Sequence, residues 1–238
     1  MSKEGLSSLS SLSSSSTSTS SSSSSSSSTD VSSPPLVSLS LLSHIKKEFV
    51  SIQQVLQVLE QANVNVNEQD EEQMASLHFA ILLSDLNLCS LLLNHGANPN
   101  IQNNCFWTPL HFAMLQSQAN NYPIAKLLLE RGAKVNIRDD EGWTPLHLAV
   151  VNKQLNLCSL LISNGANIEA KDDMGFTPLL RAVRSGNREA CELLIEHGAD
   201  LDAMAKDRRK ISDLYHPDLK EWVSFYLSAP TKSAEFFG

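Results

Sequence analysis

One four-residue pattern returns along this chain at nearly constant intervals. Its copies are Leu77-His78-Phe79-Ala80, Leu110-His111-Phe112-Ala113, Leu146-His147-Leu148-Ala149 and Leu179-Leu180-Arg181-Ala182. Successive copies lie 33, 36 and 33 residues apart, and a Gly-Ala pair beginning at Gly96, Gly132, Gly165 and Gly198 agrees with a single three-residue insertion between His111 and Gly132. Self-similarity at such a period is the signature of stacked repeats, in which each unit buries its apolar face only against its neighbours.

Each repeat is predicted to hold two short helices. Thr108-Pro109, Thr144-Pro145 and Thr177-Pro178 read as a capping residue followed by proline at the first helical position. A leucine-rich second helix then closes on the repeated glycine, which adopts a left-handed conformation at little cost. Helices of this length are marginal alone, so the units must stack to be stable.

Residues 144–149 match the T-P-L-H-x-A signature, and the chain resembles the ankyrin repeat family. The resemblance covers residues 68–202 as four repeats. It implies an all-α solenoid of stacked helix-turn-helix units with β-hairpin fingers. Three departures stand out: Ala75-Ser76 replaces Thr-Pro in the first repeat, Phe106 takes the finger glycine position, and Leu180 replaces the motif histidine.

The expected divisions of the chain follow the period outward from these four repeats. The stack is predicted to comprise a degenerate capping repeat (36–67, with a first helix over 39–50), ankyrin repeats over 68–100, 101–136, 137–169 and 170–202, and a closing capping repeat (203–228, with a helix over 218–227). The second ankyrin repeat carries the insertion, near residues 117–122. The serine-rich segment 1–35 is predicted to be disordered because it has little apolar surface to bury, and 229–238 is a tail.

Charge and cysteine content narrow the class of partner and the compartment. A net charge of −8 argues against binding nucleic acid. The basic run Lys206, Arg208, Arg209 and Lys210 is interpreted as a solvated face, with nuclear import or phosphate binding as the alternative. Without a signal peptide or a membrane-length apolar stretch, the four cysteines predict an intracellular protein, cytoplasmic or nuclear. A transit peptide is disfavoured because the first 35 residues contain no Arg. The chain is expected to be a monomer that binds no membrane.

Residues that could carry chemistry are interpreted as structural. His78 and His111 fall in successive layers about 8–10 Å apart and cannot converge on one zinc ion; the resemblance implies that they hydrogen-bond within and between repeats. Cys89, Cys158 and Cys191 share one position, filled by Ala125 in the second repeat, which indicates a slot for a small side chain. Cys105, at a finger tip, is the one thiol worth testing for reactivity. No catalytic motif appears, so no enzyme activity, cofactor or metal is expected.

The candidate binding position is the residue before each capping threonine. It reads Trp107, Trp143 and Phe176, and in the ankyrin family this position is variable and lines the concave surface that contacts partners. A solvent-facing row of aromatic rings would supply interface anchors; the alternative is that each ring folds onto its neighbour and stiffens the stack. The resemblance adds Arg138, Asp140, Glu141, Lys171, Asp173, Met174, Leu115, Val151, Asn152 and Arg184. Their mixed charge favours a protein partner over DNA or an anionic membrane.

The predicted function is a non-catalytic scaffold or adaptor that binds one protein partner on the concave ankyrin surface. One alternative is the substrate-receptor subunit of a ubiquitin ligase, which would need a docking box within residues 208–238. No Leu-x-x-Leu-Cys-Arg-like core occurs there, and Trp222, Phe225 and Tyr226 are expected to seal the last repeat instead. Another alternative is an inhibitor that covers the active surface of an enzyme or transcription factor.

Overall fold

The structure is a computed structural model that describes residues 41–45, 52–60, 64–115, 120–214 and 217–228. All of them belong to one compact unit, residues 38–238. The predictions for the serine-rich segment 1–35, for the tail 229–238 and for part of the insertion near residues 117–122 lie outside the described residues.

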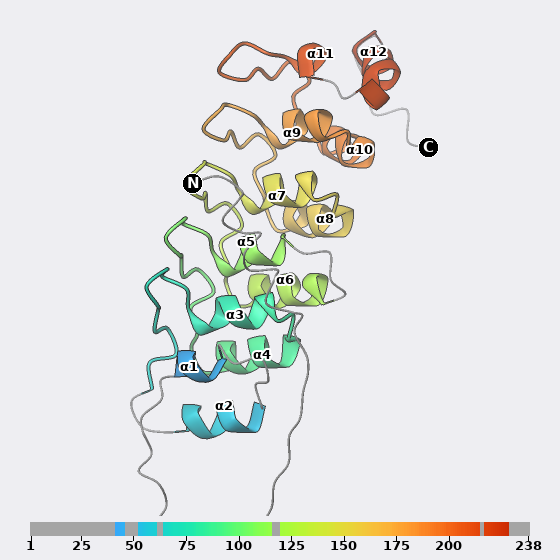
Figure 1. The fold of residues 1–238 in the computed structure, drawn as a ribbon. Helices are drawn as coiled ribbons and strands as arrows, with labels where there is room; N and C mark the ends of the chain where they lie inside the picture. Colours follow the sequence, from blue (N-terminus) through green and yellow to red (C-terminus); the bar gives the residue numbers. More distant parts are fainter. Residues whose placement is uncertain (1–40, 46–51, 61–63, 116–119, 215–216, 229–238) are drawn as a thin grey trace, which may run out of the picture. The chain divides into compact units, whose positions relative to one another are not determined.

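The described residues fold into helix pairs that stack in chain order (Figure 1). The elements are α1 (Leu41–Ile45) and α2 (Ile52–Leu59), α3 (Ser76–Leu82) and α4 (Leu86–Asn94), α5 (Pro109–Ala113) and α6 (Asn121–Glu130), α7 (Pro145–Val151) and α8 (Leu155–Ser163), α9 (Pro178–Ser185) and α10 (Arg188–Glu196), then α11 (Ile211–Leu214), the 3-10 helix η3 (Pro217–Leu219) and α12 (Lys220–Ser228). First helices pack on first helices from α3 through α11, and second helices on second helices from α4 through α10. The predicted all-α stack is confirmed.

The connections before each pair fold back as hydrogen-bonded turns rather than as paired strands. In the third repeat the Asp139 amide donates to the Trp143 carbonyl over 2.9 Å, and the Gly142 amide donates to the Asp139 carbonyl over 3.0 Å. Arms this short cannot build a ladder, and across the described residues strand-type pairing is confined to one isolated bridge, between Gln69 and Ala75. Phe106 is left-handed, with φ of 56°, as its place at the finger glycine position predicts.

Both ends of the stack contain helices where they are predicted. The described part of the first helix, α1, packs against α2 and α3, whereas residues 46–50 of the predicted helix lie outside the described residues. At the other end α11 packs against α9 and α12, and Trp222 packs against the core. The side chains of Phe225 and Tyr226 lie outside the description. The exact repeat boundaries stay a prediction.

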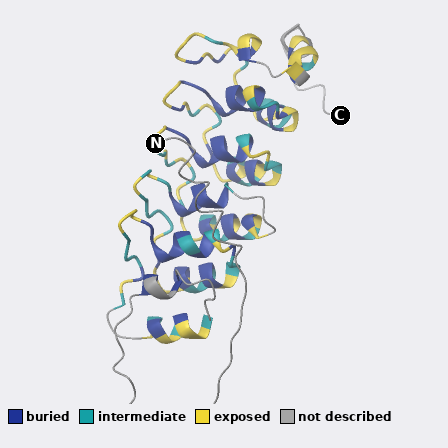
Figure 2. Cartoon of the chain, viewed as in Figure 1, coloured by how far each residue is buried: buried dark blue, intermediate teal, exposed yellow. Residues whose placement is uncertain are grey.

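The core lies between the layers, where buried positions of successive helices face each other (Figure 2). Cys89, Cys158 and Cys191 are completely buried, as is Ala125, which confirms the slot for a small side chain. Burial raises the pKa of each of these thiols to about 12, so they stay protonated and unreactive at neutral pH.

The motif histidines hold one layer to the next. In the third repeat the Thr144 amide donates to His147 Nδ1 over 3.1 Å, so Nδ1 is an acceptor and the ring proton must sit on Nε2. Nε2 then donates to the carbonyl of Phe176 in the fourth repeat, 3.1 Å away. His111 bonds to Thr108 in the same way and donates to the Trp143 carbonyl over 3.2 Å. The implied role of the histidine within and between repeats is confirmed for these two repeats.

Asparagine side chains add two further series of bonds between layers. Asn67, Asn100 and Asn136 each donate to the carbonyl of the repeated glycine one repeat on, at 3.1, 2.9 and 3.0 Å. Between the two helices of a repeat, Asn120, Asn152 and Asn187 reach back to carbonyls of the preceding repeat at 2.8, 2.7 and 2.8 Å. These bonds use carbonyl groups at or just beyond the helix ends and so join each repeat to the next.

Protonation of the motif histidines is expected to make the stack less stable in acid. Burial lowers the pKa of His78, His111 and His147 from 6.5 to about 4. Between those values the unfolded chain binds more protons than the folded one, so the free energy of unfolding falls as pH drops from 6.5 to 4. Burial raises the pKa of Asp139 to about 6, so this group by itself would raise the free energy of unfolding as the pH falls. It opposes three histidines, so the net change is expected to be a loss of stability.

Urea denaturation at about pH 7 and about pH 5 measures this loss. A His147→Leu variant, which copies Leu180 of the fourth repeat, should depend less on pH than the wild type. Equal stability of the wild type at the two pH values would contradict the assignment.

Candidate protein-binding surface

The loops before the first helices present a continuous row of tips. They are termed fingers one to five, residues 68–75, 101–108, 137–144, 170–177 and 203–210. Each finger after the first donates one tip amide to a carbonyl of the finger before it: Asn104 to Glu72, Asp140 to Cys105, Asp173 to Glu141 and Lys206 to Met174, at 3.1, 3.2, 3.0 and 3.0 Å. These bonds hold the tips in register through backbone atoms, so they do not depend on which side chains the tips carry.

The predicted row of aromatic rings does not face solvent, and this expectation is wrong for Trp143 and Phe176. Trp143 is 6% exposed and Phe176 is 0% exposed. Trp107 is half-buried, with its ring centroid 5.5 Å from that of Phe112. The alternative, that the rings fold inward and stiffen the stack, describes their geometry. The backbone carbonyls of Trp143 and Phe176 each accept a hydrogen bond from the motif histidine of the preceding repeat, which holds these two residues against that repeat.

A buried ion pair completes the packing of the last two rings. Arg181 Nε donates to Asp172 Oδ2 over 2.7 Å, and its Nη2 bonds to the same oxygen. The guanidinium lies 4.3 Å from the centroid of the Trp143 ring and 4.6 Å from that of Phe176. Asp172 Oδ1 accepts the Phe176 amide at 2.8 Å. Asp172 is fully buried and Arg181 nearly so, so the pair and the two rings form one structural cluster.

Sequence reasoning missed this cluster although a signal was present. The place of Arg181 is taken by Phe79, Phe112 and Leu148 in the other repeats, so a cation there requires a buried anion. In the third repeat Leu148 and Asp139 occupy the positions of Arg181 and Asp172, and burial raises the pKa of the Asp139 carboxyl to about 6.

The other predicted partner-binding residues divide into two groups. Leu115 and Val151 are half-buried against the core, and the Asn152 side chain donates to the Met114 carbonyl, so these three support the stack. The rest are exposed on fingers three and four or on α9, and they are Arg138, Asp140, Glu141, Lys171, Asp173, Met174 and Arg184. Arg138 bonds to Asp173 over 2.8 Å and so joins the two fingers. The structure thus brings the second group to the surface, together with Asn152, which is exposed although its side chain is bonded to the stack.

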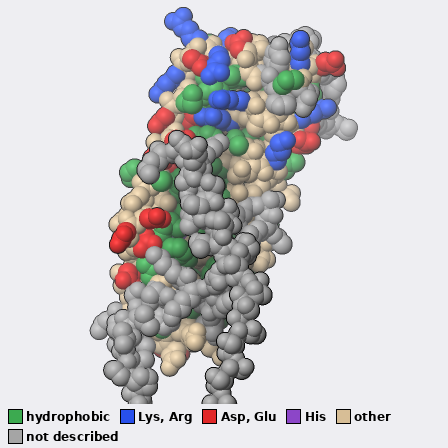
Figure 3. All heavy atoms as spheres, viewed as in Figure 1, with side chains coloured by type: hydrophobic (Ala, Val, Ile, Leu, Met, Phe, Trp, Pro, Cys, Tyr) green, Lys and Arg blue, Asp and Glu red, His purple; other side chains and the backbone are tan. Residues whose placement is uncertain are grey.

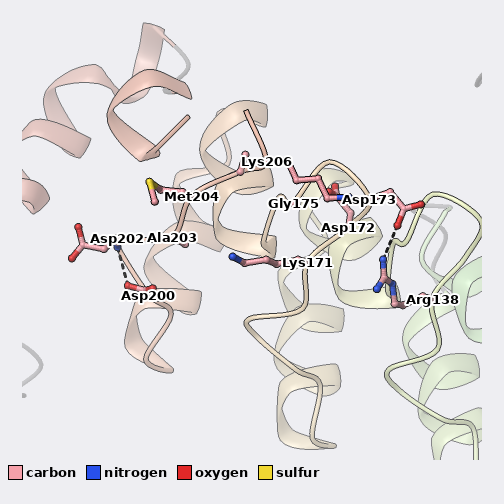
Figure 4. A pocket seen from close by; sticks show the side chains of 11 residues that line it. Arg138, Lys171, Asp172, Asp173, Gly175, Asp200, Asp202, Ala203, Met204 and Lys206 are labelled. Atoms are coloured by element: carbon pink, nitrogen blue, oxygen red, sulfur yellow. Dashed lines mark hydrogen bonds and ion pairs between the residues drawn. The ribbon is translucent and has the colours of Figure 1, made fainter. Parts of the chain in front are cut away.

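A groove of about 690 Å³ lies beside fingers four and five (Figure 4). Arg138, Lys171 and Asp173 line it, as predicted residues, together with Asp200, Asp202, Met204 and Lys206. Met174 and Met204 are 50% and 46% exposed. Met204 and Lys206 were missed because residues from 203 onward were assigned to a capping repeat; the 33-residue step from Asp173 to Lys206 is the signal that identifies finger five. Asp200 and Asp202 belong to the fourth repeat but lie outside the finger and helix-end positions that the resemblance supplied.

The chemistry-bearing residues of the surface are few. Burial raises the pKa of the half-buried Cys105 thiol, and Asp140, Asp139 and Glu72 raise it further, which lowers its thiolate fraction. Where side chains are described, no three metal-ligating groups gather in one place. None of the described helices is both long and apolar enough to cross a membrane.

Comparison with known proteins identifies the family. The family model for ankyrin repeats, in three copies, matches residues 46–139 and 114–205, which together cover more than half of the chain. The chain therefore belongs to the ankyrin repeat family. Ankyrin repeats are generally modules for protein–protein interaction and are typically non-catalytic. None of the curated proteins compared with the chain matches it.

The Arg181–Asp172 pair is expected to be strongly coupled. Arg181→Leu alone would leave a buried carboxylate without a counter-ion and lower the free energy of unfolding by about 3 kcal/mol. Adding Asp172→Asn should recover most of that loss, because Asn103 stands at this position in the second repeat. Urea denaturation of the two single variants and the double variant gives the coupling energy. If the free-energy losses of the two single variants simply add up in the double variant, Arg181 and Asp172 are not energetically coupled.

Proposed function

We propose that this chain is a non-catalytic scaffold or adaptor, a monomer within the cell that binds one protein partner along fingers three to five. The contact residues are Arg138, Asp140, Glu141, Lys171, Asp173, Met174 and Arg184, with Met204 and Lys206 added. Trp107, Trp143 and Phe176 support this surface from beneath. The observation that carries the proposal is the groove at fingers four and five, beside which Met174 and Met204 are half-exposed.

The side chains around the groove suit a protein better than a polyanion. Lys171 and Lys206 are interleaved with Asp173, Asp200 and Asp202, so neither sign of charge dominates (Figure 4). A nucleic acid would need clustered cations. Methionine is flexible and polarisable and adapts to apolar side chains of different shapes. A partner segment with alternating charges and an apolar residue between the methionines therefore matches this lining.

The rigidity of the tips supports tight binding. The backbone bonds from Asp173 to Glu141 and from Lys206 to Met174 fix neighbouring tips before a partner arrives. A surface that is already ordered loses little conformational entropy on binding. The ion pair between Arg138 and Asp173 acts in the same direction, because it joins fingers three and four.

Charge and apolar substitutions in the groove test the proposal. The full chain and a Lys171→Glu/Met174→Ser/Met204→Ser variant would each be used for affinity purification, and the retained partner would then be titrated against both by calorimetry. We expect the variant to lose about tenfold or more in affinity and to keep its unfolding midpoint.

Lys126→Glu on α6 is the matched control, since its side chain is 59% exposed on a second helix. It should bind like the wild type. Equal affinity of the groove variant and the control would reject the proposed surface.

A further inference from the structure

Finger two presents an aromatic ring to solvent in a conformation that does not favour one. Phe106 is 55% exposed and has φ of 56°, whereas Gly142 and Gly175 occupy the same place in the next two fingers. A bulky residue is strained in the left-handed region, and glycine is not. The ring therefore opposes the turn that carries it.

The turn has no structural need for this ring. The Phe106 amide donates to the Asn103 carbonyl over 2.9 Å, and the Phe106 carbonyl accepts from Gln102 Nε2 over 2.7 Å. Asn103 Oδ1 accepts the amides of Cys105 and Trp107 at 3.0 and 2.9 Å. None of these bonds uses the Phe106 side chain, so a glycine at position 106 would leave them in place. A residue kept exposed and strained points to a role outside the stack.

The fingers on either side of finger two carry exposed carboxylates. The Asn104 amide and side chain bond to the carbonyls of Glu72 and Glu71 in finger one, each at 3.1 Å. On the other side the Asp140 amide bonds to the Cys105 carbonyl and brings the tip of finger three, Asp140 and Glu141, alongside. All four acids are exposed. In Figure 3 acidic side chains gather on the lower fingers, whereas most of the visible basic side chains lie higher in the stack.

We propose that Phe106 and the four carboxylates Glu71, Glu72, Asp140 and Glu141 bind a partner segment that carries an apolar side chain between lysine or arginine residues. The apolar side chain packs on the exposed face of the ring, and a flanking cation can stack on it as well. The carboxylates pair with the remaining cations and fix the register of the segment.

This inference rests on the proposed function, because both use one row of finger tips. It extends the contact surface to fingers one and two and specifies the chemistry of the segment bound there. The lysines beside fingers four and five, Lys171 and Lys206, face a different part of the same partner. Charge on the row thus orients the partner, with its basic segment over fingers one to three.

Selection from a displayed library of random short peptides tests the inference with the full chain. The wild type is expected to enrich peptides with an apolar residue flanked by Lys or Arg. Phe106→Gly should keep the preference for Lys and Arg but lose the apolar residue, and Glu71→Lys/Glu72→Lys should lose the basic preference. A synthetic copy of the enriched peptide should bind each variant about tenfold more weakly than the wild type.

Two controls separate binding from folding. Phe106→Gly should unfold within about 3 °C of the wild type, since glycine suits the turn. Glu189→Lys/Glu196→Lys, which makes the same charge change at exposed positions of α10, should enrich the same peptides as the wild type.

Several results would overturn the inference. These are enrichment of acidic peptides, no enrichment at all, an unchanged selection by Phe106→Gly, or self-association in light scattering that Phe106→Gly abolishes. A purified partner that is lost by the groove variant but held by Phe106→Gly and Glu71→Lys/Glu72→Lys would reject this inference and leave the proposed function standing. A partner insensitive to both sets of substitutions would contradict both.

Discussion

The bond from a buried imidazole to the finger of the next repeat sets the arrangement of this protein. In the second and third repeats the capping threonine uses Nδ1 of the histidine, so the Nε2 proton has one direction left, toward the carbonyl of the residue before the next capping threonine. That carbonyl belongs to Trp143 in one case and to Phe176 in the other. Because the backbone of Trp143 or Phe176 is held against the preceding repeat, its ring is buried there as well. One hydrogen bond thus both joins the layers and decides which residues of a finger can meet a partner.

The binding surface follows from this constraint. Residues before the capping threonine are committed to the stack, and the Arg181–Asp172 pair between the last two rings reinforces that commitment. The tips lie beyond this bond, and a backbone hydrogen bond holds each one to the preceding finger. The Arg138–Asp173 ion pair and the Asn104 side chain add contacts between fingers. The backbone bonds do not depend on side-chain identity, so most tip side chains can change at little cost to folding. The stack itself does not require several of the residues at these tips. They are the acids of fingers one and three, the methionines and lysines beside the groove, and the exposed Phe106.

The sequence predicts most of the fold because period, caps and left-handed turns each leave a local mark. The step of 33 residues places the helices, Thr-Pro places their starts, and Phe106 marks a left-handed turn without glycine. Periodicity establishes only that Trp107, Trp143 and Phe176 are equivalent; it does not say whether a ring turns outward or inward. That direction depends on contacts with the next repeat. The groove was missed for a related reason, since Lys206 belongs to a finger only if the closing repeat has one.

Stability measurements on one buried and one exposed residue test this account most directly. Trp143→Ala removes a ring held between layers, whereas Met174→Ala removes a side chain at a tip, and urea denaturation gives the free energy of unfolding of each. The account predicts a loss of about 3 kcal/mol for Trp143→Ala and a change within about 0.5 kcal/mol for Met174→Ala. A stack as stable as the wild type without the Trp143 ring would contradict it.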